Sequence, residues 1–463
     1  MTMSYDIDPS LFKAYDIRGV VDRGLTRTAA YAIGAALGTE AFERGLGELA
    51  VGRDGRLSGP WLRDALIEGI RSTGTAAADI GCVPTPMLYF ATHHLGTRSG
   101  VEITGSHNPP EYNGLKLVLG DEALHGEGIQ RLRRRIESGD LRRAASAGDL
   151  RQVEVADAYL QRITGDARLA RPMRIVVDCG NGVAGAIAPR LYRALGCEVI
   201  ELFCEVDGTF PNHHPDPAHP ENLQDLIAKL AASDAELGLA FDGDGDRLGV
   251  VTRGGRIVYP DRQIMLFAAD VLARVPGGEI VYDVKCTRNL APWIRSHGGR
   301  PTMWRTGHSL IKARLRECGA PFAGEMSGHL FFNDRWYGFD DGLYAGARLL
   351  EILSRSADPS AVLDALPDSV STPELHLHTA DGENFRLVER LCAVARFEQA
   401  RELITIDGVR VEYADGFGLA RPSNTTPVVV LRFEADDAAG LARIQQDFRR
   451  AILGVAPGVQ LPF

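Results

Sequence analysis

Short apolar runs alternate with amphipathic stretches along much of the chain, a pattern typical of an α/β protein. Between the apolar runs at residues 174–177 and 237–241, apolar residues recur at the i, i+3, i+4, i+7 spacing of a helix face. These residues are Leu223, Leu226, Ile227 and Leu230. A Gly-Gly turn after residue 252 predicts a hairpin with residues 257–259, and residues 438–452 predict a late helix. The apolar runs themselves predict strands at residues 174–177, 237–241, 248–252, 280–284 and 428–433.

Two polar segments mark candidate domain boundaries. Residues 138–148 are small and polar, and residues 354–372 are polar and interrupted by proline, so we expect boundaries near residues 150 and 368. The length of 463 residues suggests about three domains. With 45% hydrophobic and 24% charged residues, the chain has the composition of a globular protein that can bury large cores.

The charge balance argues against a nucleic-acid-binding protein. The formal net charge is −10, whereas nucleic-acid binders are usually basic. Arginines are dense between Arg131 and Arg143, but Glu137 and Asp140 lie among them and favour a solvated helix face. An acidic protein can still bind anionic small substrates, because local cationic pockets focus the field.

The chain carries no apolar run of about 18 residues, and its first residues lack the basic-then-apolar order of a signal peptide. Its seven cysteines are scattered and form no Cys-x-x-Cys pair. These features predict a reduced, cytoplasmic protein without a membrane segment.

A glycine pattern after a predicted strand is compatible with the nucleotide-binding turn of a dinucleotide-dependent oxidoreductase. Gly180, Gly182 and Gly185 have the spacing of a dinucleotide-binding turn, and Glu198 or Glu201 lies near the distance expected for a ribose ligand. The structural alternative is a tight strand-to-helix turn that packs close to the sheet. The pattern is short and glycine is frequent, with 51 residues, so the longer motifs carry more weight.

Three aspartates at alternate positions predict a metal site. Asp242, Asp244 and Asp246 follow a predicted strand, and their carboxylates project to one side of an extended loop. Unpaired, they would raise one another's pKa, and a hard divalent cation with oxygen ligands removes that conflict. A calcium EF-hand does not fit, because Arg247 stands where that loop needs glycine. We therefore expect Mg²⁺ at this loop.

Other polar loops supply a nucleophile and groups suited to a phosphorylated sugar. The loop TGSHNPP places Ser106 beside His107, with Lys116 in the strand that follows, and serine needs such neighbours to act as a nucleophile. The loop GEMSGH gathers an acid, a hydroxyl and an imidazole that can hydrogen-bond sugar hydroxyls. The loop RPSNTT joins Arg421 to hydroxyl, amide and main-chain donors suited to phosphate.

Four motifs, TGSHNP, DGDGDR, GEMSGH and RPSNTTP, resemble in this order those of the α-D-phosphohexomutase family, most closely its bacterial phosphomannomutase/phosphoglucomutase group. The segments FKAYDIRG and VGRDGRLSG fit as well, so the resemblance covers nearly the whole chain. It implies an α/β fold of three similar mixed α/β domains and a smaller C-terminal α+β domain around a central cleft. The implied domains are residues 1–150 with the phosphoserine loop, 151–256 with the metal loop, 257–368 with the sugar-recognition loop and 369–463 with a phosphate-binding loop.

The resemblance also implies roles for individual residues. Ser106 resembles the family's phosphoserine, which donates a phosphoryl group and regains one in each cycle. The groups that resemble magnesium ligands are Ser106, through its phosphate, with Asp242, Asp244 and Asp246. Those that resemble catalytic groups are Arg18, His107, Lys116, Arg247 and His329, with Lys116 or His329 in proton transfer. Those that resemble substrate-binding groups are Tyr15, Lys285, His308, Glu325, Met326, Ser327, Gly328, His329, Arg421, Pro422, Ser423, Asn424 and Thr425.

The implied reaction interconverts the 1-phosphate and 6-phosphate of a hexose, mannose or glucose, through a 1,6-bisphosphate that reorients in the cleft. Glucose 1,6-bisphosphate is then intermediate and activator, the partners are phosphosugars, and the protein is a monomer or weak oligomer that serves nucleotide-sugar and polysaccharide synthesis. The alternative within the family is a phosphoglucosamine mutase, whose loop usually has GEQSGH where this chain has GEMSGH. A metal-dependent binding module without turnover is a further alternative.

Overall fold

Two units make up the part of the chain that the computed structural model describes, residues 5–424 and 426–463. Of these described residues, unit one comprises those in Met1–Pro260, Lys312–Phe322 and Ser327–Ala365. Unit two comprises those in Asp261–Ile311, Ala323–Met326 and Leu366–Phe463. The four domain ranges expected from the sequence stay a prediction.

The first sheet of unit one mixes parallel and antiparallel strands. It contains β1 (Ile17–Val20), β2 (Glu48–Arg53), β3 (Ala76–Cys82), β4 (Gly100–Ile103), β5 (Tyr112–Leu119), β6 (Glu122–Ala123) and β7 (Leu150–Gln152). Their order is β1-β5-β4-β2-β3-β7, with β6 beside β5. Strand β2 runs parallel to β3 and β4, whereas β5 runs antiparallel to β4 and β1. The loop between β4 and β5 therefore connects adjacent antiparallel strands.

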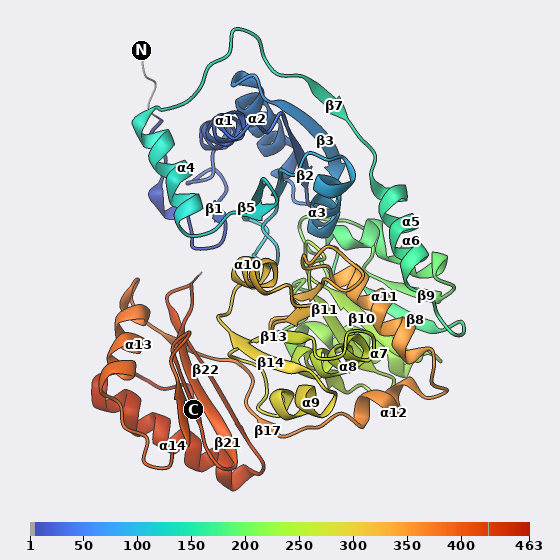
Figure 1. Cartoon of the computed structure of the whole chain (residues 1–463), viewed down its shortest axis with the longest axis vertical. Helices are drawn as coiled ribbons and strands as arrows, with labels where there is room; N and C mark the ends of the chain where they lie inside the picture. The colour runs from blue at the N-terminus through green and yellow to red at the C-terminus, as the bar shows by residue number, and fades with distance from the viewer. Residues whose placement is uncertain (1–4, 425) are drawn as a thin grey trace. The chain divides into compact units, whose positions relative to one another are not determined.

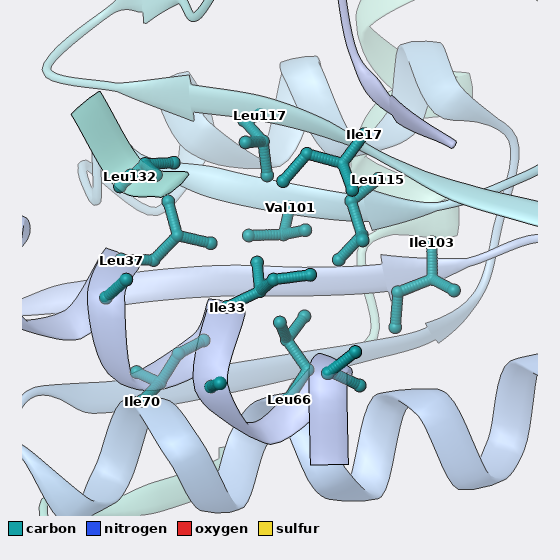
Figure 2. Close-up of a cluster of buried hydrophobic side chains, with 14 of the residues drawn as sticks. Ile17, Ile33, Leu37, Leu66, Ile70, Val101, Ile103, Leu115, Leu117 and Leu132 are labelled. Atoms are coloured by element: carbon teal, nitrogen blue, oxygen red, sulfur yellow. The ribbon is translucent and has the colours of Figure 1, made fainter. Parts of the chain in front are cut away.

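Helices cover both faces of this sheet. Helices α1 (Arg27–Glu43) and α2 (Gly59–Ser72) lie side by side (Figure 1), and together with α4 (Glu127–Ser138) they bury the side chains of one face. Figure 2 shows Ile33, Leu66 and Val101 meeting in this core. The preceding residue of β4, Gly100, faces the opposite side of the sheet, because successive positions alternate along a strand. A Cβ atom there would lie 3.1 Å from Leu88 of α3 (Thr85–His94), which covers the opposite face.

Helix α4 is amphipathic. Its arginines confirm the prediction of a solvated helix face at this part of the chain. Ile129, Leu132 and Ile136 are buried, whereas four arginines on the helix form ion pairs with carboxylates. The pairs are Arg131 with Glu40, Arg133 with Glu137, Arg134 with Glu127 and Arg135 with Glu43. The four arginines of α4 thus form a charged face of a helix, whereas Arg142 and Arg143 of the same segment follow the end of α4.

The second sheet of unit one has the order β12-β11-β10-β8-β9. It contains β8 (Arg174–Asp178), β9 (Glu198–Leu202), β10 (Leu237–Phe241), β11 (Leu248–Thr252) and β12 (Ile257–Val258), so the predicted strands and hairpin are confirmed. The predicted amphipathic helix begins as a 3-10 turn, η3 (Pro220–Leu223), and continues as α7 (Gln224–Ala231), with Leu226 and Leu230 buried. The other elements of this unit are η1 (Pro9–Leu11), α5 (Ala156–Asp166), η2 (Val183–Ala186), α6 (Ala188–Ala194), β16 (Leu330–Phe332), α11 (Gly342–Leu353) and α12 (Pro359–Asp364).

Unit two contains a parallel strand pair and an antiparallel sheet. The pair is β13 (Glu279–Asp283) with β14 (Arg300–Trp304), accompanied by α9 (Leu290–Ser296). The antiparallel sheet contains β17 (Val370–Ser371), β18 (Leu375–His378), β19 (Glu402–Ile404), β20 (Val409–Glu412), β21 (Gly416–Pro422) and β22 (Val428–Ala435). Helices α13 (Glu383–Val394) and α14 (Ala438–Val455) pack on β21 and β22, as Figure 1 shows. The elements whose residues fall in both units are α8 (Pro260–Arg274), α10 (His308–Cys318) and β15 (Phe322–Gly324).

The predicted strand at residues 428–433 and the late helix at 438–452 are confirmed by β22 and α14. Among the described helices, none combines the length and hydropathy needed to cross a membrane.

Candidate active site

Ser106 occupies the loop between β4 and β5 in a strained conformation. Its φ is 48°, a left-handed value that is uncommon for residues other than glycine, and the residue is 2% exposed. The side chain donates to Asp242 Oδ2 at 3.1 Å, and its Oγ lies 3.1 Å from His107 Nδ1. Backbone strain of this kind persists where surrounding contacts enforce it, often at functional sites. The loop thus directs a serine hydroxyl at the aspartate loop.

Arg56 holds this loop in place, a role that sequence analysis missed. Its guanidinium pairs with Asp54 at 3.1 Å, and Asp54 Oδ2 also accepts from the amide of Gly105 at 3.2 Å. A Cβ atom at position 105 would lie 2.5 Å from the guanidinium carbon, so glycine allows the close approach. The main-chain oxygens that accept from Arg56 are those of Ser106 at 2.8 Å, Asn108 at 2.6 Å, Pro109 at 2.6 Å and Tyr112 at 3.0 Å. Arg56 lies in the segment VGRDGRLSG, but no local pattern shows that it reaches a distant loop.

The three predicted metal ligands meet in the loop between β10 and β11. Asp242, Asp244 and Asp246 are fully buried, and each offers an oxygen to a group of atoms that lie within 4.8 Å of one another. Among the described residues, none hydrogen-bonds Asp244 Oδ1 or Asp246 Oδ1, although both oxygens are buried. Carboxylate oxygens are the ligands that Mg²⁺ prefers. The residues present therefore fit a hard divalent cation.

Lys116 on β5 gives the aspartates unequal proton affinities. Its Nζ donates to Asp244 Oδ2 at 2.7 Å and to Asp246 Oδ2. Burial lowers the pKa of Lys116, but the two aspartates outweigh burial and hold it well above its ordinary value. Burial also raises the pKa of Asp246, yet Lys116 and His329 bring it well below the usual range. Burial and the charges of Asp244 and Asp246 raise the pKa of Asp242 well above that range, so Asp242 binds a proton most tightly of the three.

Arg247 connects the serine loop to the predicted sugar loop. Its Nη2 donates to His107 Nδ1 at 2.8 Å, and its Nε donates to His329 Nε2 at 3.4 Å. His329 Nδ1 lies 2.9 Å from Ser327 Oγ, and Gly328 O accepts from the main chain of Leu248. Burial, then the charges of Arg247 and Arg18, lower the pKa of His107 well below its ordinary value, so His107 stays neutral. The structure thus brings together the catalytic residues predicted in unit one.

Arg18 on β1 reaches the same serine loop. It donates to the side chain of Asn108, and its other end pairs with Asp16 at 2.5 Å. Tyr15 lies partly buried in the segment before β1. The loop of Ser106 is therefore in contact with a cation, Arg18, as well as with the carboxylate of Asp242.

Three further residues of unit one, which belong to none of the sequence motifs, lie close to Asp244 or His329. Thr85 at the start of α3 donates to Asp244 Oδ2 at 2.6 Å. Lys312 donates to Asp340 Oδ1 at 2.8 Å, and Asp340 Oδ2 lies 4.0 Å from His329 Nε2. These contacts join segments far apart in the sequence, so spacing alone could not predict them.

The other predicted substrate-binding groups lie in unit two, where Met326 is bonded to Asp283 at the end of β13. Asp283 Oδ1 accepts from the amide of Met326 at 3.0 Å, and its Oδ2 accepts from Thr306 Oγ1 at 2.9 Å. Glu325 Oε1 accepts from the amide of Gly307 at 2.6 Å, so the loops before α10 and after β15 are bonded to each other. His308 is the first residue of α10.

Lys285 and Arg421 are both paired with carboxylates. Lys285 donates to Glu374 Oε1 at 2.6 Å. Burial raises the pKa of Glu374, but Lys285 and then the nearby arginines bring it to about 2. Arg421 Nε donates to Asp407 Oδ2 at 2.9 Å.

The predicted phosphate loop continues from the end of β21. Pro422 is the last residue of that strand, and Ser423 Oγ lies 2.9 Å from Thr426 Oγ1. Asn424 is partly buried beside them, and Thr425 falls outside the described residues.

The glycine segment at residues 180–185 forms a tight turn. The amides of Gly182 and Gly185 donate to main-chain oxygens within the turn, and that of Val183 donates to Gly243 O at 3.1 Å. A Cβ atom at Gly185 would clash with the main-chain oxygen of Cys204. Because a dinucleotide site would need these amides for a pyrophosphate, the structure favours the structural alternative.

Comparisons with known proteins show which family the chain resembles along nearly its whole length. The family models "Phosphoglucomutase/phosphomannomutase, alpha/beta/alpha domain" I, II and III match residues 9–143, 157–255 and 259–370, and the C-terminal-domain model matches residues 379–451. A relative from Neisseria gonorrhoeae, named phosphoglucomutase, is 58% identical over 447 residues, 96% of this chain and 97% of the relative. A relative from Pseudomonas aeruginosa, named phosphomannomutase/phosphoglucomutase, is 56% identical over 455 residues, 98% of each chain.

A solved structure of a protein from this family is also similar to this chain. The crystal structure of a phosphoglucomutase/phosphomannomutase family protein from Burkholderia thailandensis is similar with a TM-score of 0.95 and 60% identity, and the match covers 99% of this chain and 100% of that one. These matches confirm the predicted succession of three α/β domains and a C-terminal domain. The chain belongs to the phosphoglucomutase/phosphomannomutase family.

Proposed function

We propose that this protein is a phosphohexomutase that interconverts the 1-phosphates and 6-phosphates of glucose and mannose through a phosphoserine at Ser106. The observation that carries the proposal is the strained, buried Ser106, whose Oγ lies 3.1 Å from Asp242 in a group of three buried aspartates. The names of the relatives from Neisseria gonorrhoeae and Pseudomonas aeruginosa support the same activity.

In this proposal, the Oγ–P bond of phosphorylated Ser106 breaks as a bond forms between phosphorus and the free hydroxyl at C1 or C6 of the sugar. Of the two groups predicted for proton transfer, His329 would take the hydroxyl proton, because Asp244 and Asp246 hold the pKa of Lys116 well above its ordinary value and keep it charged. The resulting 1,6-bisphosphate presents its other phosphate, whose bond to the sugar oxygen breaks as a new bond forms between phosphorus and Ser106 Oγ. The serine gives up its hydroxyl proton in this step, and the released sugar oxygen takes up a proton. Glucose 1,6-bisphosphate is thus the intermediate for glucose, and added bisphosphate rephosphorylates enzyme that has lost its phosphate.

The charges around Ser106 suit phosphoryl transfer, which depends chiefly on positioning and charge stabilisation. Bound Mg²⁺, held by Asp242, Asp244 and Asp246 with an oxygen of the phosphate, would neutralise negative charge on the transferred group. Arg247 and Arg18 supply fixed positive charge on the serine loop. An acidic protein can bind an acidic substrate where such cations are gathered.

Within unit two, we assign binding roles to two loops. Glu325 would accept hydrogen bonds from sugar hydroxyls, and its Oε1 is oriented by the amide of Gly307. Arg421, Ser423 and Asn424 would bind the phosphate that is not transferred, because a planar guanidinium and adjacent donors match phosphate oxygens. We further propose that the protein is a cytoplasmic monomer or weak oligomer.

A coupled assay tests the proposal by detecting glucose 6-phosphate formed from glucose 1-phosphate, with Mg²⁺ and a trace of glucose 1,6-bisphosphate. Ser106→Ala should lower turnover by at least about a thousandfold, because it removes the group that is phosphorylated. Ser138→Ala is the matched control, since Ser138 Oγ also hydrogen-bonds within its own segment but is exposed on α4. Glucose 1-phosphate binding without turnover in the wild type would instead indicate a binding module.

A further inference from the structure

Asp407 and Arg421 form a nearly buried pair in unit two. Arg421 Nε donates to Asp407 Oδ2 at 2.9 Å, and Nη2 lies 3.5 Å from Oδ1. Their side chains are 9% and 6% exposed, respectively. The carboxylate therefore lies along one edge of the guanidinium that we assign to phosphate binding.

The local fold builds this pairing. Asp407 precedes β20, and Val409 of β20 lies opposite Ala420 of β21. Gly408 between them has φ of 84°, and a Cβ atom there would lie 2.6 Å from Arg421 Cα. Because glycine alone tolerates both conditions, the turn packs directly on the end of β21. This packing sets the Asp407 carboxylate beside the Arg421 side chain.

Asp407 is itself anchored from a second loop. Its Oδ2 accepts from the amide of Thr306 at 2.9 Å, so one oxygen receives both Thr306 N and Arg421 Nε. Thr306 Oγ1 donates to Asp283 Oδ2 at 2.9 Å, and Asp283 Oδ1 accepts from the amide of Met326 at 3.0 Å. A continuous series of hydrogen bonds thus runs from Arg421 to the loop of Glu325 and Met326.

We propose that Asp407 is a positioning residue, which fixes the plane of the Arg421 guanidinium for the phosphate that is not transferred and couples it to the sugar loop. This inference rests on the proposed function. An anion beside a phosphate site repels phosphate. If Asp407 were merely a counter-ion, its removal would therefore strengthen substrate binding, whereas removal of a positioning residue weakens it. Whether substrate binding becomes stronger or weaker when Asp407 is removed therefore separates the two roles.

Two substitutions separate charge from geometry. Asp407→Ala removes the charge and the acceptor, whereas Asp407→Asn removes the charge but keeps an amide oxygen that can accept from Arg421 Nε and Thr306 N. We expect Asp407→Ala to raise KM for glucose 1-phosphate about tenfold, with kcat changed less than about threefold. Asp407→Asn should raise KM by no more than about threefold, a partial rescue that a merely structural role would not give.

The control is Asp415→Ala, at the other end of the β20–β21 hairpin, where Asp415 pairs with Arg443. It should leave KM and kcat unchanged. An unchanged or lowered KM in Asp407→Ala would overturn the proposal, and if that variant does not fold, a lowered KM in Asp407→Asn overturns it equally. The wild type is measured in the same assay, so a failure of the proposed function, which shows as no turnover, is distinguished from a failure of this inference.

Discussion

Arg56 donates to the main-chain oxygen of Ser106 at 2.8 Å, so a residue between β2 and α2 holds the backbone of the candidate nucleophile. Ser106 has a left-handed φ of 48°, which costs free energy unless its surroundings enforce it. Arg56 supplies that enforcement, because it donates to several carbonyls of one loop while Asp54 balances its charge.

Replacement of Arg56 by lysine tests this role. Lysine keeps the charge beside Asp54 but lacks the planar fork that binds several carbonyls at once. We expect Arg56→Lys to lower kcat at least about tenfold and to destabilise the fold by about 2 kcal/mol, because buried carbonyls lose their donors. Activity and thermal unfolding measure both effects. Arg63→Lys, at a partly exposed arginine paired with Asp64, is the control, and equal behaviour of the two variants would contradict the account.

Magnesium binding should release a proton. The pKa of Asp242 is raised by burial and by Asp244 and Asp246, so a cation bound by this carboxylate must displace a proton in the pH range below that pKa. Mg²⁺ affinity should therefore rise with pH. Calorimetric titration in two buffers of different ionisation enthalpy measures the protons released. Asp242→Asn should abolish the release, and wild-type affinity that is independent of pH would contradict this assignment.

Glucose and mannose phosphates should react at similar rates. The two sugars differ in configuration at C2, whereas we assign Glu325 to hydroxyls that they share. We expect kcat/KM for glucose 1-phosphate and mannose 1-phosphate to agree within about tenfold, or about 1.4 kcal/mol. Initial rates on both sugars and on glucosamine 1-phosphate measure this. A marked preference for glucosamine 1-phosphate would instead support the phosphoglucosamine mutase alternative.

Asp341 should make the stability of unit one depend on pH. Burial raises the pKa of Asp341 to about 7, although bonds from Tyr344 and Tyr159 oppose the rise. The folded chain then holds the proton more tightly than the unfolded chain, so stability is lost as pH rises from the ordinary aspartate range toward 7.

Asp341→Asn removes this titration while keeping a good N-cap for α11. Relative to the wild type, the variant should gain about 3 kcal/mol between pH 5 and pH 7, at about 1.4 kcal/mol per pH unit, and little more above pH 7. Urea unfolding at several pH values measures the difference. Parallel stability curves for the two proteins would show that Asp341 does not titrate in this range.

Sequence patterns predicted the parts of the fold that depend on local periodicity. The strands at residues 174–177 and 237–241 follow from apolar runs, and both are present. The helix containing Leu226 and Leu230 is also present, but it begins with a 3-10 turn that periodicity does not distinguish. Glycine spacing at residues 180–185 suggested a nucleotide site, yet it serves close packing, because a spacing does not reveal where the amides donate.

The parts of the candidate site that could be predicted are those whose reactive residues lie together in one short motif. Asp242 and Ser106 lie in distinctive loops, and the structure places them 3.1 Å apart. Arg56 and Asp407 were missed, because each acts through contacts with a loop remote in sequence. Such contacts depend on tertiary packing, which one sequence does not display.

Phosphoryl transfer to Ser106 tests the central claim most directly. The purified protein is incubated with glucose 1,6-bisphosphate and Mg²⁺, desalted, and analysed by intact mass and peptide mapping. We predict a mass increase of one phosphoryl group on the peptide that contains Ser106, its loss on addition of glucose 1-phosphate, and no increase in Ser106→Ala. An unmodified protein, or a phosphoryl group on another residue that does not pass to the sugar, would contradict the account.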